Sequence, residues 1–405
     1  MNRLAAEVGN LEAAVNKALA RPDPVPGIKA ALALTRFSFA AESCQIVLPR
    51  ALEKAREVQN SALVARVLSK MADASMEYSQ HEDARPKFEE ALLLFREVGD
   101  VQREGYCTRK LGEIAFRLSD HETAKTLYER AVPLLLSAKD VLGVAYCELG
   151  LGDIALDRSA PEAASALFER ALINFRAMEN VLGIANCTRN LGIIARERRN
   201  YETARKHFQD ALTGYRRIGE VIGEANCIAD LGEISLAESD LEAACRHFEE
   251  GERLYRRVES LRGAANCIRK LGEAAMRQKS YQSAREKIDE ALGLYEKTKS
   301  VFGRAHCFRL LGDIAVEQGL ATEAVDRYRQ SLALFESIPN PEFIGRLHER
   351  LAHIASQGER LEEHVNAART AWSEIGREDL IAALDQSFTL KSVVASKRRK
   401  GPRRR

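Results

Sequence analysis

Residues 181–220 read VLGIANCTRNLGIIARERRNYETARKHFQDALTGYRRIGE, and this stretch is one copy of a motif that recurs along most of the 405-residue chain. Within it, Cys187 is followed by Gly192, and the pair returns at one constant interval without insertions. A fixed period in this range is typical of a solenoid, in which stacked units share a continuous core. The recurring positions are Cys107, Cys147, Cys187, Cys227, Cys267 and Cys307; Gly112, Gly152, Gly192, Gly232, Gly272 and Gly312; and Ala124, Ala164, Ala204, Ala244, Ala284 and Ala324.

Each copy predicts two helices. Small and apolar residues in the first half of the unit, such as Ala185, Leu191 and Ile194, follow a helical period and not the alternation of a strand. A second apolar stripe, which includes Ala204 and Phe208, predicts another helix over about 201–217. The loops between them are short, so the two helices are expected to be antiparallel neighbours.

The turns between the two helices contain apparent start signals. A serine followed three positions later by glutamate fits a capping box, in which the hydroxyl and the carboxylate satisfy opposite backbone N–H groups. We therefore expect capping boxes at three of these turns. They would be formed by Ser119 with Glu122, Ser159 with Glu162, and Ser239 with Glu242.

Glycine within a helix costs up to about 1 kcal/mol relative to alanine, so the recurring glycine needs a compensating reason. Close approach of the two helices is the expected one. The aromatic residue of the second helix is predicted to press against the glycine; in successive units it is Tyr128, Phe168, Phe208 and Phe248.

The recurring cysteines are predicted to be packing residues. They lie one whole repeat apart, and no C-x-x-C or Cys/His pattern with zinc-ligand spacing is present. The equivalent positions outside the run are Val67 and Leu347, which also favours a hydrophobic role.

Composition limits the class of protein. Hydrophobic residues make up 45% of the chain and charged residues 30%, without an apolar run near membrane-spanning length, so neither a membrane protein nor a disordered chain is expected. The N-terminus lacks the basic patch and apolar stretch of a secretory signal, and an intracellular, cytoplasmic protein is expected.

The repeated skeleton resembles the tetratricopeptide repeat. Leu191-Gly192, Ala204 and Phe208 match the family's Leu-Gly, alanine and aromatic positions, and the match recurs six times in register over about residues 61–376. The unit is longer than the family's usual length of about 34 residues. It is similar to the 40-residue repeats of LGN/Pins-type scaffold proteins. The resemblance implies an all-α, right-handed superhelical solenoid of antiparallel helix pairs, with about eight repeats plus caps.

The ends of the chain depart from the repeat. We expect a short N-terminal helix and Pro-rich linker over 1–26, a degenerate capping repeat over 27–60, the tandem repeats over 61–340, and a divergent repeat with a capping helix over 341–390. Trp372 and nearby apolar residues are expected to close the open end of the stack. A disordered basic tail is predicted for 391–405.

Function must come from a surface, because a fold alone does not give one. The resemblance implies a concave groove lined by first helices, and one row of their residues varies between units while the packing positions do not. Such variation suits recognition of a peptide or helix of another protein. The groove residues we expect are Tyr106, Arg109, Tyr146, Asn186, Arg189, Asn226, Asn266, Arg269, His306 and Arg309.

Two interpretations of this row remain open. The asparagines could bind the backbone of an extended peptide while Arg189, Arg269 and Arg309 hold its carboxylates. Alternatively, Arg269 with Glu273 and Arg309 with Asp313 are ordinary i, i+4 pairs, and the asparagines bond the next helix. Acidic residues occupy the positions where the family's clamp for chaperone tails has lysine and asparagine, which argues against that ligand.

No enzyme, cofactor or metal site is predicted. The chain lacks a phosphate loop, HExxH and G-x-S-x-G, and its histidines are scattered. His348 and His353 lie five positions apart, which is the wrong spacing for a shared helix face.

The C-terminal tail is strongly basic. It has eight positive charges, and the whole chain has a net charge of +2, so the remainder is mildly acidic. Such a run fits a nuclear-import signal, an arm for nucleic acid or anionic lipid, or a solubilising terminus. A nucleic-acid-associated adaptor is therefore the alternative to a protein-binding scaffold. We expect a monomer, with self-association as a third and weaker interpretation. The tail residues concerned are Lys397, Arg398, Arg399, Lys400, Arg403, Arg404 and Arg405.

Overall fold

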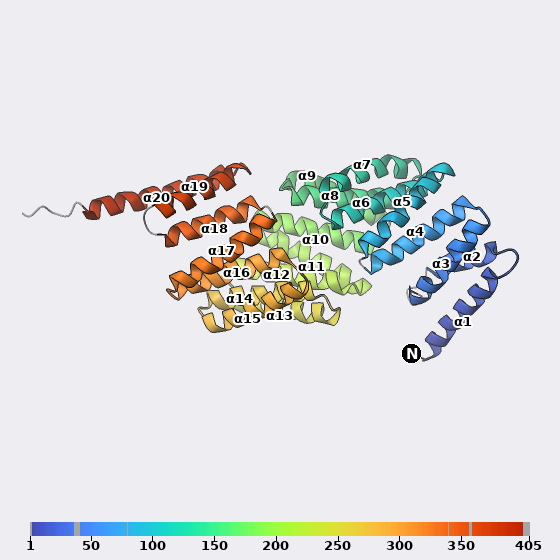
Figure 1. Ribbon diagram of the computed structural model, residues 1–405, viewed down its shortest axis with the longest axis horizontal. Helices are drawn as coiled ribbons and strands as arrows, with labels where there is room; N and C mark the ends of the chain where they lie inside the picture. Colours follow the sequence, from blue (N-terminus) through green and yellow to red (C-terminus); the bar gives the residue numbers. More distant parts are fainter. Residues whose placement is uncertain (1, 36–40, 79, 339, 356–358, 400–405) are drawn as a thin grey trace, which may run out of the picture. The chain divides into compact units, whose positions relative to one another are not determined.

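The computed structural model describes the backbone of residues 2–35, 41–78, 80–338, 340–355 and 359–399; within these ranges, the side chains of 2–8, 41–44, 359 and 389–399 are not described. In this part of the chain all regular secondary structure is helical (Figure 1). The chain divides into two compact units, residues 1–214 and 215–405.

The first unit is a series of helices in which each packs on the next. Its first three helices, α1, α2 and α3, pack on one another, and α2 also contacts α4. From α4 onward the helices form antiparallel pairs, α4 with α5, α6 with α7 and α8 with α9 (Figure 1). The helices are α1 (Asn2–Leu19), α2 (Val25–Leu34), α3 (Ala41–Glu57), α4 (Ser61–Glu77), α5 (His81–Glu97), α6 (Val101–Arg117), α7 (His121–Ser137), α8 (Val141–Asp157), α9 (Pro161–Ala177) and α10 (Val181–Glu197).

The boundary between the units falls within α11 (Tyr201–Ile218). The second unit continues the pattern with the pairs α12 and α13, α14 and α15, α16 and α17, and α18 and α19, and α20 packs on α19. Its helices are α12 (Val221–Ala237), α13 (Leu241–Arg257), α14 (Leu261–Arg277), α15 (Tyr281–Lys297), α16 (Val301–Glu317), α17 (Ala321–Ser337), α18 (Pro341–Ile354), α19 (Glu359–Ser373) and α20 (Glu378–Arg399).

From α4 to α18 the helices begin at one constant interval, and the junction between α6 and α7 shows how a helix end and the next start share residues. At the end of α6, Ser119 has φ +63°, its N–H donates to the Phe116 carbonyl at 2.9 Å, and the Asp120 N–H donates to the Ala115 carbonyl at 2.9 Å. These two bonds form a Schellman motif. Asp120 is also the N-cap of α7, because its Oδ1 accepts from the Thr123 N–H at 3.1 Å. One residue thus ends one helix and starts the next.

The predicted capping boxes are wrong by one residue. Ser119, Ser159 and Ser239 all have positive φ and close the preceding helix, so their hydroxyls are not N-caps. The residue after each serine occupies the N-cap position: Asp120 and Asp240 cap through their carboxylates, whereas Ala160 has no side-chain cap. The N-cap was assigned to the wrong residue at these turns because serine and aspartate are both good capping residues.

The close approach of helices at the recurring glycine is confirmed. A Cβ atom placed on Gly152 would lie 2.5 Å from Cε1 of Phe168, and one on Gly192 would lie 2.7 Å from Cε1 of Phe208. Real Cβ atoms do not approach so closely, so any larger residue would push the helices apart. Burying an aromatic side chain stabilises by about 1.5–3 kcal/mol, which exceeds the cost of glycine in the helix.

A second row of glycines, which the sequence reasoning did not use, works between consecutive pairs. Gly143, at the start of α8, faces Leu135 of α7, where a Cβ would lie 2.8 Å from Cδ2. Gly263 and Gly303 face Tyr255 and Tyr295 in the same way. In the repeats that have both, one glycine row lies within the helix pair and the other lies between that pair and the pair before it.

The packing role of the recurring cysteines is confirmed. All six are at most 1% exposed, and within the described residues none of them forms a disulfide. Burial raises the pKa of the Cys107, Cys147, Cys187, Cys267 and Cys307 thiols to about 12, so these groups stay protonated near neutral pH.

The chain ends differ from the expected boundaries. α2 begins at Val25, inside the predicted linker, because Pro26 lies in its first turn, where proline is tolerated. Trp372 is 1% exposed, packs against Leu384 and donates its Nε1–H to the Glu342 carbonyl at 3.3 Å. α20 extends to Arg399, so the backbone is helical where a disordered tail was expected from 391.

Phe168→Ala is expected to reduce the free energy of unfolding by about 3–5 kcal/mol, because Phe168 is 0% exposed and fills the space over Gly152. Chemical denaturation followed by circular dichroism measures the change. Ile173→Ala on the same helix is the control, since Ile173 is 66% exposed and its loss should change stability by less than about 0.5 kcal/mol. Equal effects of the two changes would contradict the proposed packing.

Lys279→Gly is expected to raise the free energy of unfolding by about 0.5–1 kcal/mol. Lys279 has φ +61°, a conformation that costs a residue with a side chain about 1–2 kcal/mol, and the greater unfolded-state entropy of glycine offsets part of the gain. Gly319, at φ +75° in the equivalent position, provides the opposite test. Gly319→Ala should lower stability by about 1 kcal/mol, and thermal melts that show both changes with the same sign would disprove this account.

Candidate functional site

The predicted groove residues lie on the first helices of the pairs, in the middle of each helix. We call their row, on α6, α8 and α10 in the first unit and on α12, α14 and α16 in the second, the first-helix face. Most of these side chains are half-buried; Asn266 is exposed, and His306 is only 8% exposed. The face is therefore much less open than a row of solvent-exposed side chains.

In the first unit, Arg109 lies between two tyrosine rings. Its guanidinium carbon is 5.3 Å from the centroid of Tyr106 on the same helix and 5.2 Å from that of Tyr146 on α8. Glu113 lies 3.7 Å from a terminal nitrogen, and the Tyr106 hydroxyl donates to Asp73 at 2.5 Å. Cation–π contacts and a carboxylate therefore both stabilise the charge of Arg109.

Asn186 and Arg189 of α10 are half-buried, and both interact with neighbouring groups. One residue beyond this row, Asn190 donates from its amide nitrogen to Oδ1 of Asp153 on α8 at 2.6 Å. Burial raises the pKa of the Asp153 carboxyl to about 7, although the Asn190 hydrogen bond opposes this effect. Asp153 therefore titrates near neutral pH.

In the second unit the asparagines bond the following helix, as the simpler interpretation predicts. Asn226 accepts from the Tyr255 hydroxyl at 2.5 Å, and Asn266 accepts from the Tyr295 hydroxyl at 2.6 Å. The side-chain oxygens are thus used within the fold. The side-chain N–H groups of these asparagines are the donors that a bound molecule could use.

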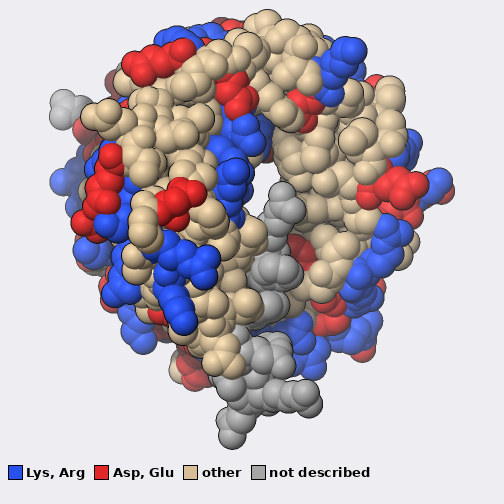
Figure 2. Space-filling view, turned by 90° about the vertical axis from the view of Figure 1, so that its right-hand side faces the viewer, with Lys and Arg blue, Asp and Glu red and all other residues tan. Residues whose placement is uncertain are grey.

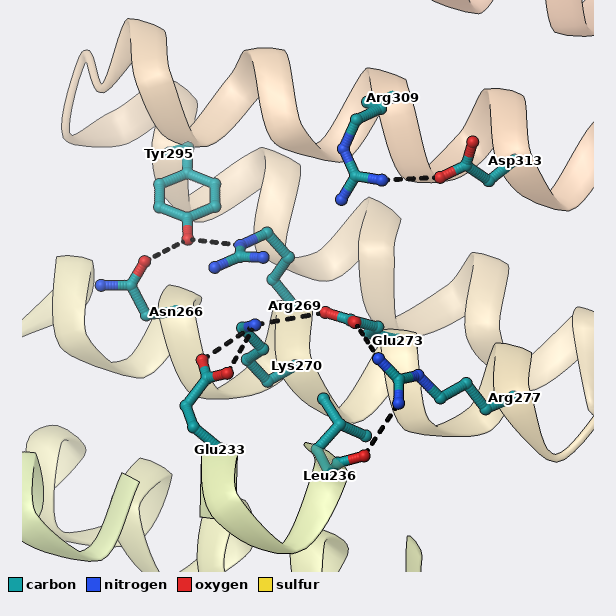
Figure 3. A network of polar contacts seen from close by, with 10 residues as sticks. All are labelled: Glu233, Leu236, Asn266, Arg269, Lys270, Glu273, Arg277, Tyr295, Arg309 and Asp313. Carbon is teal, nitrogen blue, oxygen red and sulfur yellow. Dashed lines mark hydrogen bonds and ion pairs between the residues drawn. The ribbon is translucent and has the colours of Figure 1, made fainter. Parts of the chain in front are cut away.

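The ion pairs beside Arg269 differ from the expected one (Figure 3). Glu273 does not pair with Arg269; it lies 3.2 Å from Lys270 and 3.0 Å from Arg277. Lys270 also contacts Glu233 of α12 at 2.8 Å, which joins neighbouring first helices. The Arg269 Nε–H donates to the Tyr295 hydroxyl at 3.4 Å. The sequence analysis did not include Lys270 and Asn190, because they lie one position outside the predicted row. Helix spacing could have found them, since they come four positions after Asn266 and Asn186 and so share their helix face.

Arg309 forms the predicted i, i+4 pair with Asp313, at 2.7 Å. Asp313 is shared, because Arg350 of α18 lies 2.8 Å away and the Tyr328 hydroxyl donates to it at 2.7 Å. His306, predicted to line the groove, instead lies among the rings of Phe302, Phe335 and Phe343, with centroids 4.5–5.3 Å away. Burial, together with Arg269, Arg309 and Lys270, lowers the pKa of His306 to about 2, so its imidazole is neutral.

His348 pairs with His364 of α19, with their Nδ1 atoms 3.0 Å apart. The ring centroids are 5.2 Å apart, so the two nitrogens point toward each other as in an N–H···N hydrogen bond. Within the described residues, no group of three or more histidine, cysteine or acidic side chains is arranged to hold a metal ion.

A family model described as tetratricopeptide repeat matches residues 63–137, 178–257 and 263–337, which together exceed half of the chain. The chain belongs to the tetratricopeptide repeat family. No curated protein matches the sequence at a significant level. The recurring helix pairs are therefore tetratricopeptide repeats, and their likeness to LGN/Pins-type repeats stays a prediction.

Solved structures of tetratricopeptide repeat folds resemble the chain at low sequence identity. The apo form of the quorum sensor NprR from B. thuringiensis has a TM-score of 0.65 and 14% identity, over 87% of this chain and 100% of that one. The Rap conjugation gene regulator of plasmid pLS20, in complex with the Phr* peptide, has a TM-score of 0.56 and 16% identity, over 86% and 96%. A STAND protein from Pyrococcus horikoshii with a tetratricopeptide repeat sensor has a TM-score of 0.62 and 14% identity. The similarity covers 91% of this chain and 56% of that protein. At these identities the likeness concerns the fold.

The remaining surface of the tetratricopeptide repeats carries both charges. Figure 2 shows acidic and basic side chains scattered among uncharged residues, mainly toward the edges of the face it displays. None of the described helices is long and apolar enough to cross a lipid bilayer. The predicted basic tail lies outside the described side chains, which end at residue 388.

Asp153→Asn is expected to stabilise the protein at pH 8 by about 1 kcal/mol or more, and by less at pH 5. The folded-state pKa is raised to about 7 from an ordinary 3.8, so the stability that the protonated acid contributes is lost as the pH rises toward 7. Asparagine cannot ionise and can still accept from Asn190. Thermal melts at both pH values measure the difference; a gain that is larger at pH 5 would contradict it. Asp326→Asn, at an exposed acid of α17, is the control and should change stability little at either pH.

Proposed function

We propose that this tetratricopeptide repeat protein is a non-enzymatic scaffold that binds a peptide or helix of another protein along the first-helix face. The residues proposed to contact the partner are Tyr106, Arg109, Tyr146, Asn186 and Arg189 in the first unit, and Asn226, Asn266, Arg269 and Arg309 in the second; His306, buried among Phe302, Phe335 and Phe343, is left out. The observation that carries the proposal is the variation of this row between otherwise constant repeats: glycine, cysteine and alanine keep their positions, while the row changes between aromatic, amide and basic side chains. Selection for packing alone gives no reason for such a difference.

Local geometry supports the same face. Arg109 and the two tyrosines of the first unit contact one another, and the asparagines of the second unit are fixed by tyrosine hydroxyls, so their orientations are set before a partner arrives. Preorganised side chains lose little conformational entropy on binding. The Rap regulator with a bound Phr* peptide provides a precedent for peptide binding on a related fold.

Ile193→Trp combined with Ala229→Trp is expected to abolish binding to immobilised random peptides that the wild-type protein captures. The two changes place bulky rings on the first-helix face of each unit, on α10 and α12, where Ile193 and Ala229 are half-buried. The matched control, Ile173→Trp with Ala333→Trp, puts the same rings on exposed positions of second helices and should leave binding intact. Melting temperatures of both double variants are compared first. Equal peptide capture by the two variants would rule out the first-helix face.

A further inference from the structure

His348 of α18 and His364 of α19 form a direct polar contact between the two helices of the last pair. Their Nδ1 atoms are 3.0 Å apart and their ring centroids 5.2 Å apart, so one Nδ1–H donates to the other Nδ1. A neutral imidazole has one N–H donor and one acceptor nitrogen. The contact therefore exists only while at least one of the two Nδ1 atoms has no proton.

This hydrogen bond limits the number of protons that the two rings can bind together. A first additional proton, placed on Nε2 of the donor ring, leaves the donating Nδ1–H where it is. A second one would put hydrogens on both Nδ1 atoms, and two positively charged donors would then face each other. The closed contact thus excludes at least one proton that separate rings would bind below their ordinary pKa of about 6.5.

The surroundings of the two rings act in the same direction. Both rings are half-buried. Burial and the neighbouring His364 lower the pKa of His348, and burial lowers the pKa of His364. Because a lowered pKa in the folded state means that the closed contact resists protonation, its contribution to stability is present above about pH 6.5 and is lost as the pH falls below that value.

The charged groups around the pair do not provide for two imidazolium rings. Glu363, an exposed acid of α19, favours protonation of both rings, whereas Arg329 of α17 and Arg360 of α19 disfavour it at His364. Other charged groups of the packed helices have partners of their own: Asp385 of α20 pairs with Arg369, Arg346 and Arg350 of α18 pair with Glu342 and Asp313, and Glu349 acts on Arg350.

The pair lies at the end of the second unit, where α19 and α20, which we call the cap helices, follow α18. Trp372 of α19 is 1% exposed, and a Cβ atom on Gly345 of α18 would have no room beneath it. His353 of α18 stacks on Phe388 of α20, with ring centroids 4.8 Å apart. Terminal helices of a stack have neighbours on one side only, so they can separate while the other repeats stay folded.

We propose that the contact between His348 and His364 is a pH-sensitive device that holds the cap helices on α18 at neutral pH and releases them at acidic pH. Release exposes Trp372 and the surface of α18 beneath it. Exclusion of one proton from the closed contact raises the equilibrium constant for opening about thirtyfold between pH 7.5 and pH 5.0, because a free imidazole with a pKa of about 6.5 changes from mostly neutral to mostly protonated over this range.

Trp372 is the only tryptophan of the chain, so its emission maximum reports on the cap helices directly. Urea titrations of the full chain at pH 7.5 and pH 5.0 give the equilibrium constant for its exposure, and circular dichroism follows the helices of the whole array in parallel. We expect the constant to rise about thirtyfold more in the wild-type protein than in His348→Gln with His364→Gln, whose amides can form a hydrogen bond but do not ionise in this range. His207→Gln with His247→Gln, at two half-buried histidines of other helices, is the matched control and should keep the wild-type pH dependence.

Equal pH dependence in the wild-type protein and the variant of the pair would overturn the proposal. Coincident transitions of Trp372 emission and circular dichroism at pH 5.0 would also overturn it, because the cap helices would then not open by themselves. If Trp372 of the variant is already exposed at pH 7.5, NMR titration of the wild-type histidine rings decides. Protonation of both rings together with exposure of Trp372 supports the proposal, and protonation of both while Trp372 stays buried contradicts it.

Discussion

The contact between a helical glycine and an aromatic or large aliphatic side chain of the neighbouring helix is the constraint on which the array depends. At Gly152 and Gly192 there is no room for a Cβ atom beneath Phe168 and Phe208. Each unit in a stack contacts only its neighbours, so a change in helix separation at one repeat has no distant contact to correct it. Burial of the large side chain is worth more than the helix loses through glycine, and this holds at Gly112, Gly152, Gly192, Gly232 and Gly312 with an aromatic ring and at Gly272 with Ile288.

The junctions determine how these contacts are brought into register. Asp120 closes the Schellman motif of α6 and caps α7, so the connection has no spare residue. Because the helices from α4 to α18 start at one constant interval, equivalent side chains on neighbouring first helices come side by side. Arg109 therefore meets Tyr146 of the next repeat, and Lys270 meets Glu233 of the repeat before it. The constant spacing of the helices thus determines which side chains of the first-helix face contact one another.

Packing could be predicted from this sequence more completely than polar contacts could. The period alone locates the glycines, cysteines and aromatic residues, because each has one steric role that is repeated in every unit. Polar groups have several acceptable partners: Glu273 could pair with Arg269 by helix spacing, but Lys270 and Arg277 reach it instead. Ser119 and Asp120 are both good caps, and only the backbone conformation decides between them. His306 is buried by Phe302, Phe335 and Phe343, whose positions do not follow from the repeat pattern.

Arg109 in the first unit and Arg269 in the second are both half-buried, but their neighbours differ. Around Arg109 the fold provides two aromatic faces and, at 3.7 Å, the carboxylate of Glu113, while the buried Nε of Arg109 has no hydrogen-bond partner among the described residues. Around Arg269 the described fold provides the Tyr295 hydroxyl at 3.4 Å, while Glu233 and Glu273 make their ion pairs with Lys270 and Arg277 and act on Arg269 only at longer range. The glycine and large packing residues recur with few exceptions, so the first-helix face differs between repeats mainly through such polar positions. Because a half-buried guanidinium repels like charge, these positions disfavour basic segments that would otherwise fit the same helices.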